Sequence, residues 1–218
     1  MPKITSVEPQ KKNPKRFNVF LDGVFAFGAD EDLVVEYRLV VGKLLEISEV
    51  EKLLFEAEVG KLMERMYRIF NIRQRSEKEV KDYFRIKNYE SRIKGEEQTS
   101  ELAIELVIKK LKQKNLLNDK EFAKAWVESR KKKKGSRVLK QELFQKGIDK
   151  EIIEEVISSQ LSVVREEQVA QQLLDKKMKV WKNLPRIEFK KKAIDFLLRR
   201  GFEYEVVKSI IDKISKQV

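Results

Sequence analysis

The sequence contains no cysteine and no histidine. The first absence excludes disulfides and thiolate chemistry, and the second removes the commonest general base and metal ligand. The 8 glycines form neither a GxxxxGK[ST] phosphate loop nor a GxGxxG pattern. No uncharged apolar run approaches the ~20 residues that a membrane span needs, and the N-terminus lacks the apolar segment of a signal peptide. We therefore expect a cytoplasmic protein that is not an enzyme and binds no cofactor, metal or membrane.

Carboxylates are plentiful, and three adjacent pairs could suggest a metal or acid–base site. Glu96-Glu97, Glu154-Glu155 and Glu166-Glu167 each lie among lysines, in stretches that are either helical or loop-like. Charged runs of this kind are typical of solvated surfaces. We interpret all three pairs as exposed faces.

Positive charge is what the chain has in excess. It carries 48 Lys and Arg against 36 Asp and Glu, a net charge of +12. Residues 101–150 hold 15 basic and 7 acidic side chains, and so contribute two-thirds of that excess. A localised excess favours a polyanion-binding surface, although a lysine-rich surface that serves only solubility is the alternative.

The first 28 residues are the only part with a β pattern. Lys3–Val7, Phe17–Leu21 and Val24–Phe27 are short runs rich in β-branched and aromatic residues. Asp22-Gly23 is a strong signal for a two-residue hairpin turn. The polar stretch 10–13, bracketed by prolines, is expected to be a loop.

From Asp30 to the last proline, Pro185, the apolar spacing is helical. Ser48 and Ser76, each followed three residues later by glutamate, predict capping boxes at two helix starts. Asn118 is expected to cap another helix. Gly60 predicts a kink or a boundary in the first long helix.

An internal repeat gives the fold class. Aligning Gly147 with Gly201 superimposes a helix, a left-handed glycine, a buried residue and a second helix. This alignment pairs Leu143 with Leu197, Lys146 with Arg200, Ile148 with Phe202, Ile152 with Val206 and Val156 with Ile210. Aligning Asn88 with Gly147 gives an earlier, looser copy that pairs Val80 with Leu139, Phe84 with Leu143 and Tyr89 with Ile148. Chance coincidence between helices is the alternative, and it applies more strongly to the first copy.

We predict a mainly α protein, an elongated and curved array of three tandem three-helix repeats with a small N-terminal β-hairpin extension. The predicted segments are 1–57 for the hairpin and helical extension, 58–116 for repeat one, 117–162 for repeat two and 163–218 for repeat three.

Basic clusters fall at matching places in the copies, near the start of the second helix of each. Lysines and arginines there could contact several phosphates with salt-dependent, sequence-tolerant affinity. Ordinary solvated turns are the alternative. The candidate residues are Arg73, Arg75, Arg130, Lys131, Lys132, Lys133, Lys134, Arg137, Lys140, Lys190, Lys191, Lys192, Arg199 and Arg200. Because Trp126 lies four residues after Phe122, we expect it in the core rather than on a base-stacking surface.

The residues also resemble a known family. FLDGVFAFGADEDLV, NIRQRSEKEVKDYF, LLNDKEFAKAWVESRKKKKGSRVLKQELFQKGI and FLLRRGFEYEVV, in this order, are similar to segments of RecX, the regulatory protein of the bacterial RecA recombinase. Two departures stand out. Ser136 replaces a proline of many relatives, where it could serve as a helix N-cap. The run of four lysines is heavier than usual, which suggests more direct affinity for DNA.

The resemblance implies a partner and a role. It implies binding along the groove of the RecA–single-stranded DNA filament, and modulation, usually inhibition, of the recombinase, ATPase and coprotease activities of RecA. It carries no catalytic residues. We expect single-stranded DNA and, more weakly, double-stranded DNA as further partners of a monomer. A non-specific DNA-binding helical module that acts without RecA is the alternative, and a nuclease is a more distant one.

Overall fold

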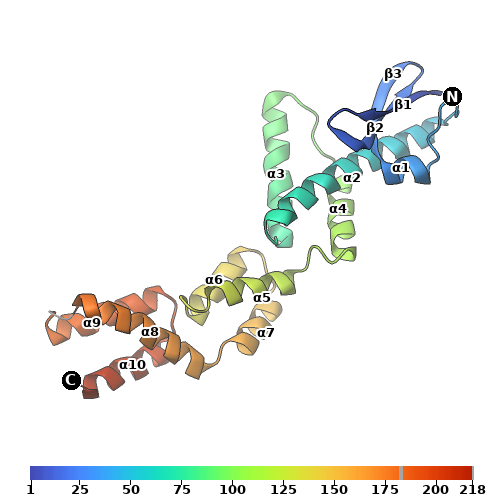
Figure 1. Cartoon of the computed structure of the whole chain (residues 1–218). Helices are drawn as coiled ribbons and strands as arrows, with labels where there is room; N and C mark the ends of the chain where they lie inside the picture. The colour runs from blue at the N-terminus through green and yellow to red at the C-terminus, as the bar shows by residue number, and fades with distance from the viewer. Residues whose placement is uncertain (182–183, 218) are drawn as a thin grey trace. The chain divides into compact units, whose positions relative to one another are not determined.

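A computed structural model describes residues 1–181 and 184–217, with side chains described as far as Ile214. Helices make up most of this part of the chain, and a small antiparallel sheet lies at the N-terminus (Figure 1). The chain divides into two compact units. The N-terminal unit comprises residues 1–74 and 81–117, and the C-terminal unit comprises residues 75–80 and 118–218.

The sheet of the N-terminal unit has the order β1-β2-β3, with β1 at Ile4–Gln10, β2 at Asn13–Leu21 and β3 at Val24–Asp30. Asp22 and Gly23 both have positive φ, at 47° and 83°, so the predicted hairpin turn is confirmed. The predicted loop at 10–13 is wrong, because Pro9 and Pro14 lie inside strands and only residues 11–12 form the turn. A register shift between Pro9 and Gln10 accommodates the prolines, as expected where a ladder donor is missing.

Helices α1 at Glu31–Glu36, α2 at Ile47–Ile72 and α4 at Glu101–Gln113 complete this unit, together with α3 at Glu77–Lys94 from residue 81 onward. The sheet, α1 and the start of α2 enclose one core that includes Ile4, Val19 and Leu53. Arg16 is buried, but it donates to the carbonyl of Gly28 at 2.9 Å and pairs with Glu64 at 3.1 Å. These bonds satisfy the buried cation and connect the sheet to α2.

Two local predictions about α2 are wrong. The N-cap is Glu46 with Glu49 as its capping-box partner, so Ser48 lies inside the helix. Gly60 does not mark a helix boundary, because α2 runs through it without interruption. A Cβ at Gly60 would lie 2.9 Å from a carboxylate oxygen of Asp30, so this glycine allows a close approach instead. The predicted boundary at 57/58 therefore falls within a continuous helix.

The predicted alignment of the first repeat copy holds for only part of α3. Ser76 caps α3 as predicted, since its hydroxyl accepts from the N–H of Glu79. Asn88, however, lies inside α3, where its side chain bonds both to the N–H and to the carbonyl of Thr99. Gly95 takes the left-handed conformation, at φ 69°, and Tyr89 is 57% exposed where its aligned partner Ile148 is buried. The alignment on Asn88 thus holds for Val80 and Phe84 but fails beyond them.

The C-terminal unit contains two three-helix sets. The first consists of α5 at Asp119–Arg130, α6 at Ser136–Gln145 and α7 at Lys150–Gln160. The second consists of α8 at Val163–Trp181, α9 at Arg186–Arg199 and α10 at Tyr204–Gln217. Each set has its own core, and Asn118 caps α5 as predicted.

The alignment of these two sets is confirmed. Gly147 and Gly201 both have positive φ, at 76° and 84°, immediately after α6 and α9. Of the aligned apolar positions, all are buried except Ile152, which is partly buried against its core. The exact limits of the repeats stay a prediction.

Candidate nucleic-acid interface

The basic turn between α5 and α6, residues 131–135, is anchored by its backbone. The N–H of Gly135 donates to the carbonyl of Arg200 at 2.9 Å, and the N–H of Arg137 donates to that of Gly201 at 3.0 Å. A Cβ at Gly135 would lie 2.4 Å from the carbonyl oxygen of Gly201, and one at Gly201 would lie 2.5 Å from the Cβ of Val138. The two backbone segments can approach this closely only because both positions are glycine.

The same docking occurs once more in the C-terminal unit. The hydroxyl of Ser76, fully buried, donates to the carbonyl of Lys146 at 2.7 Å. Lys78 donates to the carbonyl of Gln145 at 2.8 Å, and Lys146 pairs with Glu79 at 2.6 Å. In both places, the turn before a helix docks on the C-terminal end of a later helix: the turn before α3 docks on the end of α6, and the turn before α6 docks on the end of α9. The lysine turn is therefore a structural joint as well as a basic surface.

Lys131 does not face solvent as its place in the lysine run suggested. It is 6% exposed and pairs with Glu128 one turn earlier. The hydrogen bond from Lys131 holds the pKa of the Glu128 carboxyl below its ordinary value of 4.5. Lys140 is likewise paired, with Glu154 at 2.7 Å.

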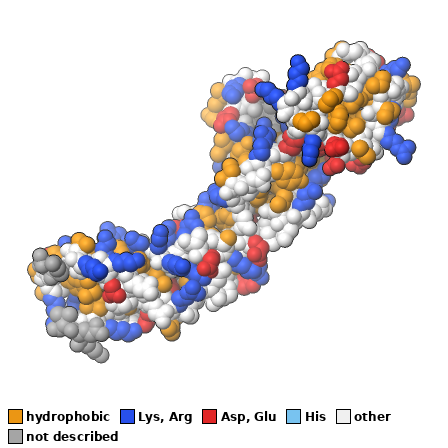
Figure 2. All heavy atoms as spheres, viewed as in Figure 1, with side chains coloured by type: hydrophobic (Ala, Val, Ile, Leu, Met, Phe, Trp, Pro, Cys, Tyr) orange, Lys and Arg blue, Asp and Glu red, His pale blue; other side chains and the backbone are white. Residues whose placement is uncertain are grey.

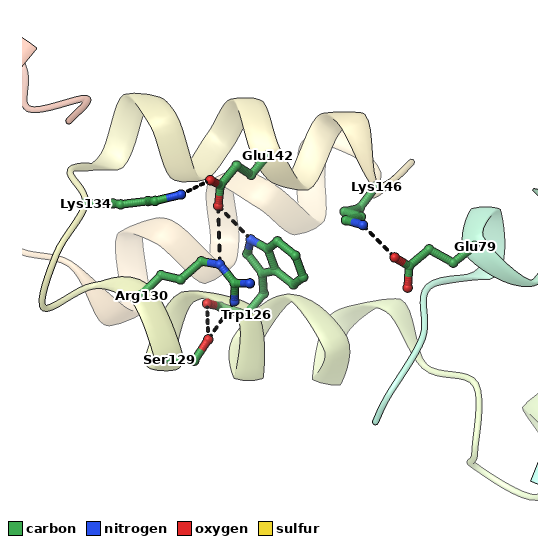
Figure 3. Close-up of polar contacts among 7 residues, drawn as sticks. All are labelled: Glu79, Trp126, Ser129, Arg130, Lys134, Glu142 and Lys146. Atoms are coloured by element: carbon green, nitrogen blue, oxygen red, sulfur yellow. Dashed lines mark hydrogen bonds and ion pairs between the residues drawn. The ribbon is translucent and has the colours of Figure 1, made fainter. Parts of the chain in front are cut away.

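Glu142 on α6 gathers three donors from α5 and the basic turn (Figure 3). One carboxylate oxygen pairs with Lys134. The other accepts from the indole N–H of Trp126 at 3.0 Å and lies 3.6 Å from Nε of Arg130. The guanidinium of Arg130 also stacks over the Trp126 ring, 3.4 Å from its centroid. Trp126 packs partly against the core as predicted, with its ring covered by a cation.

Four arginines bond to backbone carbonyls. Arg137 donates to Leu198, Arg200 to Lys133, Arg199 to Asp195 and Arg73 to Gln74. Arg75 is half-buried, and its Nε is enclosed without a hydrogen-bond partner among the described residues.

Among the candidate lysines, five form neither an ion pair nor a side-chain hydrogen bond within the described part of the chain: Lys132, Lys133, Lys190, Lys191 and Lys192. The first two are exposed on the α5–α6 turn, and the other three lie on α9. Lys and Arg side chains are spread along the face of the C-terminal unit shown in Figure 2. These five lysines can contact phosphate without breaking an internal ion pair.

One carboxylate expected at the surface is buried instead. Glu166 accepts the N–H of Ser136 at 2.6 Å. Ser136 itself is buried, and Gly135 rather than Ser136 occupies the N-cap of α6. Glu166 thus supplies from α8 the cap that the predicted serine hydroxyl does not. Within the described residues, no group of three or more acidic side chains is placed to hold a metal, and no helix is long and apolar enough to cross a membrane.

Comparison with known proteins agrees with this architecture. The protein-family model described as "Regulatory protein RecX N-terminal domain" matches residues 2–46. Those described as the second and third three-helix domains of RecX match residues 118–157 and 165–211. "Regulatory protein RecX" of Bacillus subtilis (strain 168) is 38% identical over 216 residues, which cover 98% of this chain and 78% of the relative. The chain belongs to the RecX family.

Other RecX proteins show the same relationship. The protein of Bacillus velezensis is 36% identical over 217 residues, with the same coverage of the two chains. A solved structure, "Crystal structure of regulatory protein RecX", has a TM-score of 0.75 at 26% identity and covers 97% of this chain and 100% of its own. RecX from Lactobacillus salivarius, at 24% identity, shows the shared fold with a TM-score of 0.62 over 73% of this chain and 97% of its own.

The sequence did not indicate which carboxylates form internal ion pairs with the candidate cations of this RecX family member. Glu142, Glu128 and Glu154 neutralise four of the candidates. The pairing of Glu128 with Lys131 has a readable signal, since residues three apart share a helix face. The convergence on Glu142 spans 8 to 16 residues and two helices, so no local spacing indicates it.

Proposed function

We propose that this chain binds the RecA–single-stranded DNA filament along its groove and inhibits the recombinase, ATPase and coprotease activities of RecA. The observation that carries the proposal is the similarity to proteins named "Regulatory protein RecX" over 98% of the chain. We further propose that the protein acts as a monomer and that it binds single-stranded DNA more tightly than double-stranded DNA.

The distribution of free cations supports this role. Lys132 and Lys133 lie on the turn between α5 and α6, and Lys190–Lys192 lie on α9, so the two groups belong to different three-helix sets. Each exposed lysine contributes a weak, salt-dependent phosphate contact. Weak contacts on linked modules add through effective concentration, provided that the modules reach their sites together. A repetitive ligand such as a nucleoprotein filament offers such sites at regular intervals.

RecA-dependent strand exchange, measured over a titration of this protein, tests the proposal. We expect inhibition at far fewer molecules than RecA subunits, because one bound molecule would block a filament that many subunits share. Filament ATPase and coprotease activity should fall over the same range. Unchanged strand exchange at a one-to-one ratio would contradict the proposal.

The same titration separates the alternative, a DNA-binding module that acts without RecA. The unpaired lysines favour some affinity for DNA alone. If inhibition requires enough protein to saturate the DNA, the alternative is supported and the proposed action on the RecA filament is contradicted. Incubation of labelled DNA with the protein and Mg²⁺ tests nuclease activity, and we expect no cleavage.

A further inference from the structure

The arrangement around Glu142 has the form of an anion site that is filled from within. Three donors converge on its two oxygens: the Lys134 ammonium, the Arg130 guanidinium and the Trp126 indole N–H (Figure 3). A phosphodiester also presents two anionic oxygens, and guanidinium and ammonium groups bind phosphate as readily as carboxylate.

We propose that Glu142 is a built-in competitor for nucleic-acid phosphate. Its carboxylate occupies the anion position between Arg130 and Lys134, and a phosphodiester of single-stranded DNA takes that position when the strand binds. The inference rests on the proposed DNA contact and names the residues of one subsite within it. Glu142 thereby lowers the affinity of the protein for free DNA.

Exposure of the three groups allows this exchange. The side chains of Arg130, Lys134 and Glu142 are 34%, 37% and 21% exposed. Ion pairs with this access to water are held weakly, so a second anion can replace the first at little cost. The neighbouring Lys132 and Lys133 are exposed on the same turn and would contact adjacent phosphates.

The fold does not require a carboxylate at this position. In the next three-helix set, the residue aligned with Glu142 is Phe196. Its ring packs edge-on against Trp181, with centroids 5.8 Å apart, and the guanidinium of Arg200 lies 4.9 Å from its centroid. An aromatic contact, flanked by a cation, therefore joins the corresponding helices there without a carboxylate. The carboxylate of Glu142 therefore adds an anion at a position that the other set fills with an aromatic ring.

The test compares Glu142→Gln with Glu151→Gln. Glutamine keeps an oxygen that can accept from Trp126 and removes only the charge. Glu151 is exposed on α7 and forms no ion pair within the described residues, so its substitution changes the net charge equally without freeing Arg130 or Lys134. Fluorescence anisotropy of a labelled oligodeoxythymidylate at low salt measures the affinity. We expect Glu142→Gln to bind about 3- to 10-fold tighter, and Glu151→Gln to change by less than about 2-fold.

A double-mutant cycle with Lys134→Gln distinguishes local competition from a general effect of charge. In the natural background, Lys134 is already neutralised, so its loss should change affinity by less than about 2-fold. In the Glu142→Gln background, the same loss should weaken binding by about 3- to 10-fold. Glu142→Ala provides a second variant, and far-UV circular dichroism checks that each variant is folded.

Equal affinities of Glu142→Gln and Glu151→Gln, or additive effects of Lys134→Gln, would overturn the inference. Strand exchange by the natural protein is measured in parallel. If that protein inhibits RecA while Glu142→Gln gains no DNA affinity, the inference fails and the proposed function stands. If Glu142→Gln gains affinity but the natural protein leaves strand exchange unchanged, the subsite stands and the filament role fails.

Discussion

At the scale of single residues, adjacent lysines of one run have different environments. Lys131 is buried beside Glu128, whereas Lys132 and Lys133 are exposed without an ion pair in the described chain. Burial removes the stem of Lys131 from water, and its packing contributes to stability. The turn therefore combines a structural lysine with two that are free to bind.

Replacing Lys132 and Lys133 together with Ala should weaken binding to single-stranded DNA and leave stability unchanged. Each lost phosphate contact should reduce the slope of log affinity against log salt by about 0.7, so the pair should reduce it by roughly 1.4. Lys131→Ala should instead cost about 1–2 kcal/mol of unfolding free energy, because it removes a buried stem and a paired charge. Anisotropy over a salt series and urea unfolding measure the two effects. An unchanged salt slope in the double variant would identify these lysines as ordinary surface.

Gly201 is constrained both by its positive φ and by a close contact with a neighbouring side chain, and the two effects can be measured separately. Its φ is +84°, and an added Cβ would meet Val138 at 2.5 Å. Gly95 has a similar φ of +69° with nothing within 4 Å of an added Cβ. Gly95→Ala should cost about 1 kcal/mol for backbone strain, and Gly201→Ala about 2–4 kcal/mol because overpacking is added. Urea unfolding followed by circular dichroism compares them, and equal losses would mean that the close approach is relieved by a small shift.

At the scale of elements, the turn before α3 docks on the end of α6, and the turn before α6 docks on the end of α9. Ser76 caps α3 and also donates to the carbonyl of Lys146 at the end of α6, whereas Ser100 only caps α4, by accepting from the N–H of Ala103. Ser100→Ala should cost about 1 kcal/mol as a lost cap. Ser76→Ala should cost roughly 2–3 kcal/mol, because it also leaves the carbonyl of Lys146 without its buried donor. If the two losses were equal in urea unfolding, the bond to Lys146 would contribute nothing net.

The repeat alignment has its own energetic consequence. Leu143 and Leu197 occupy aligned positions at the centres of two cores, and both are fully buried. Truncation of either to Ala should cost about 2–5 kcal/mol. Leu102, 71% exposed on α4, is the matched control and should lose less than about 0.5 kcal/mol. A loss below about 1 kcal/mol at either core position would contradict the alignment.

Elements that depend on local chemistry were predictable from the sequence. The hairpin at Asp22-Gly23 and the left-handed ends at Gly147 and Gly201 follow from backbone preferences of a few residues. The predicted alignment fails at Asn88, because this residue does not end the helix and its side-chain amide instead bonds to Thr99, 11 residues away. The candidate site was predictable only as an excess of charge. Which lysine is free depends on carboxylates placed by packing between helices, and single-sequence spacing does not encode that.

At the scale of the whole molecule, binding to free DNA and action on a filament should respond differently to lost charge. Free DNA is held almost entirely by phosphate contacts, whereas a filament also offers protein surface. The Lys132 and Lys133 double variant should lose about 10-fold in affinity for an oligodeoxythymidylate at low salt, yet shift the midpoint of strand-exchange inhibition by less than about 3-fold. Titrations of both activities with one preparation make the comparison. Equal shifts would show that DNA contacts alone carry the inhibition, and would favour the module that acts without RecA.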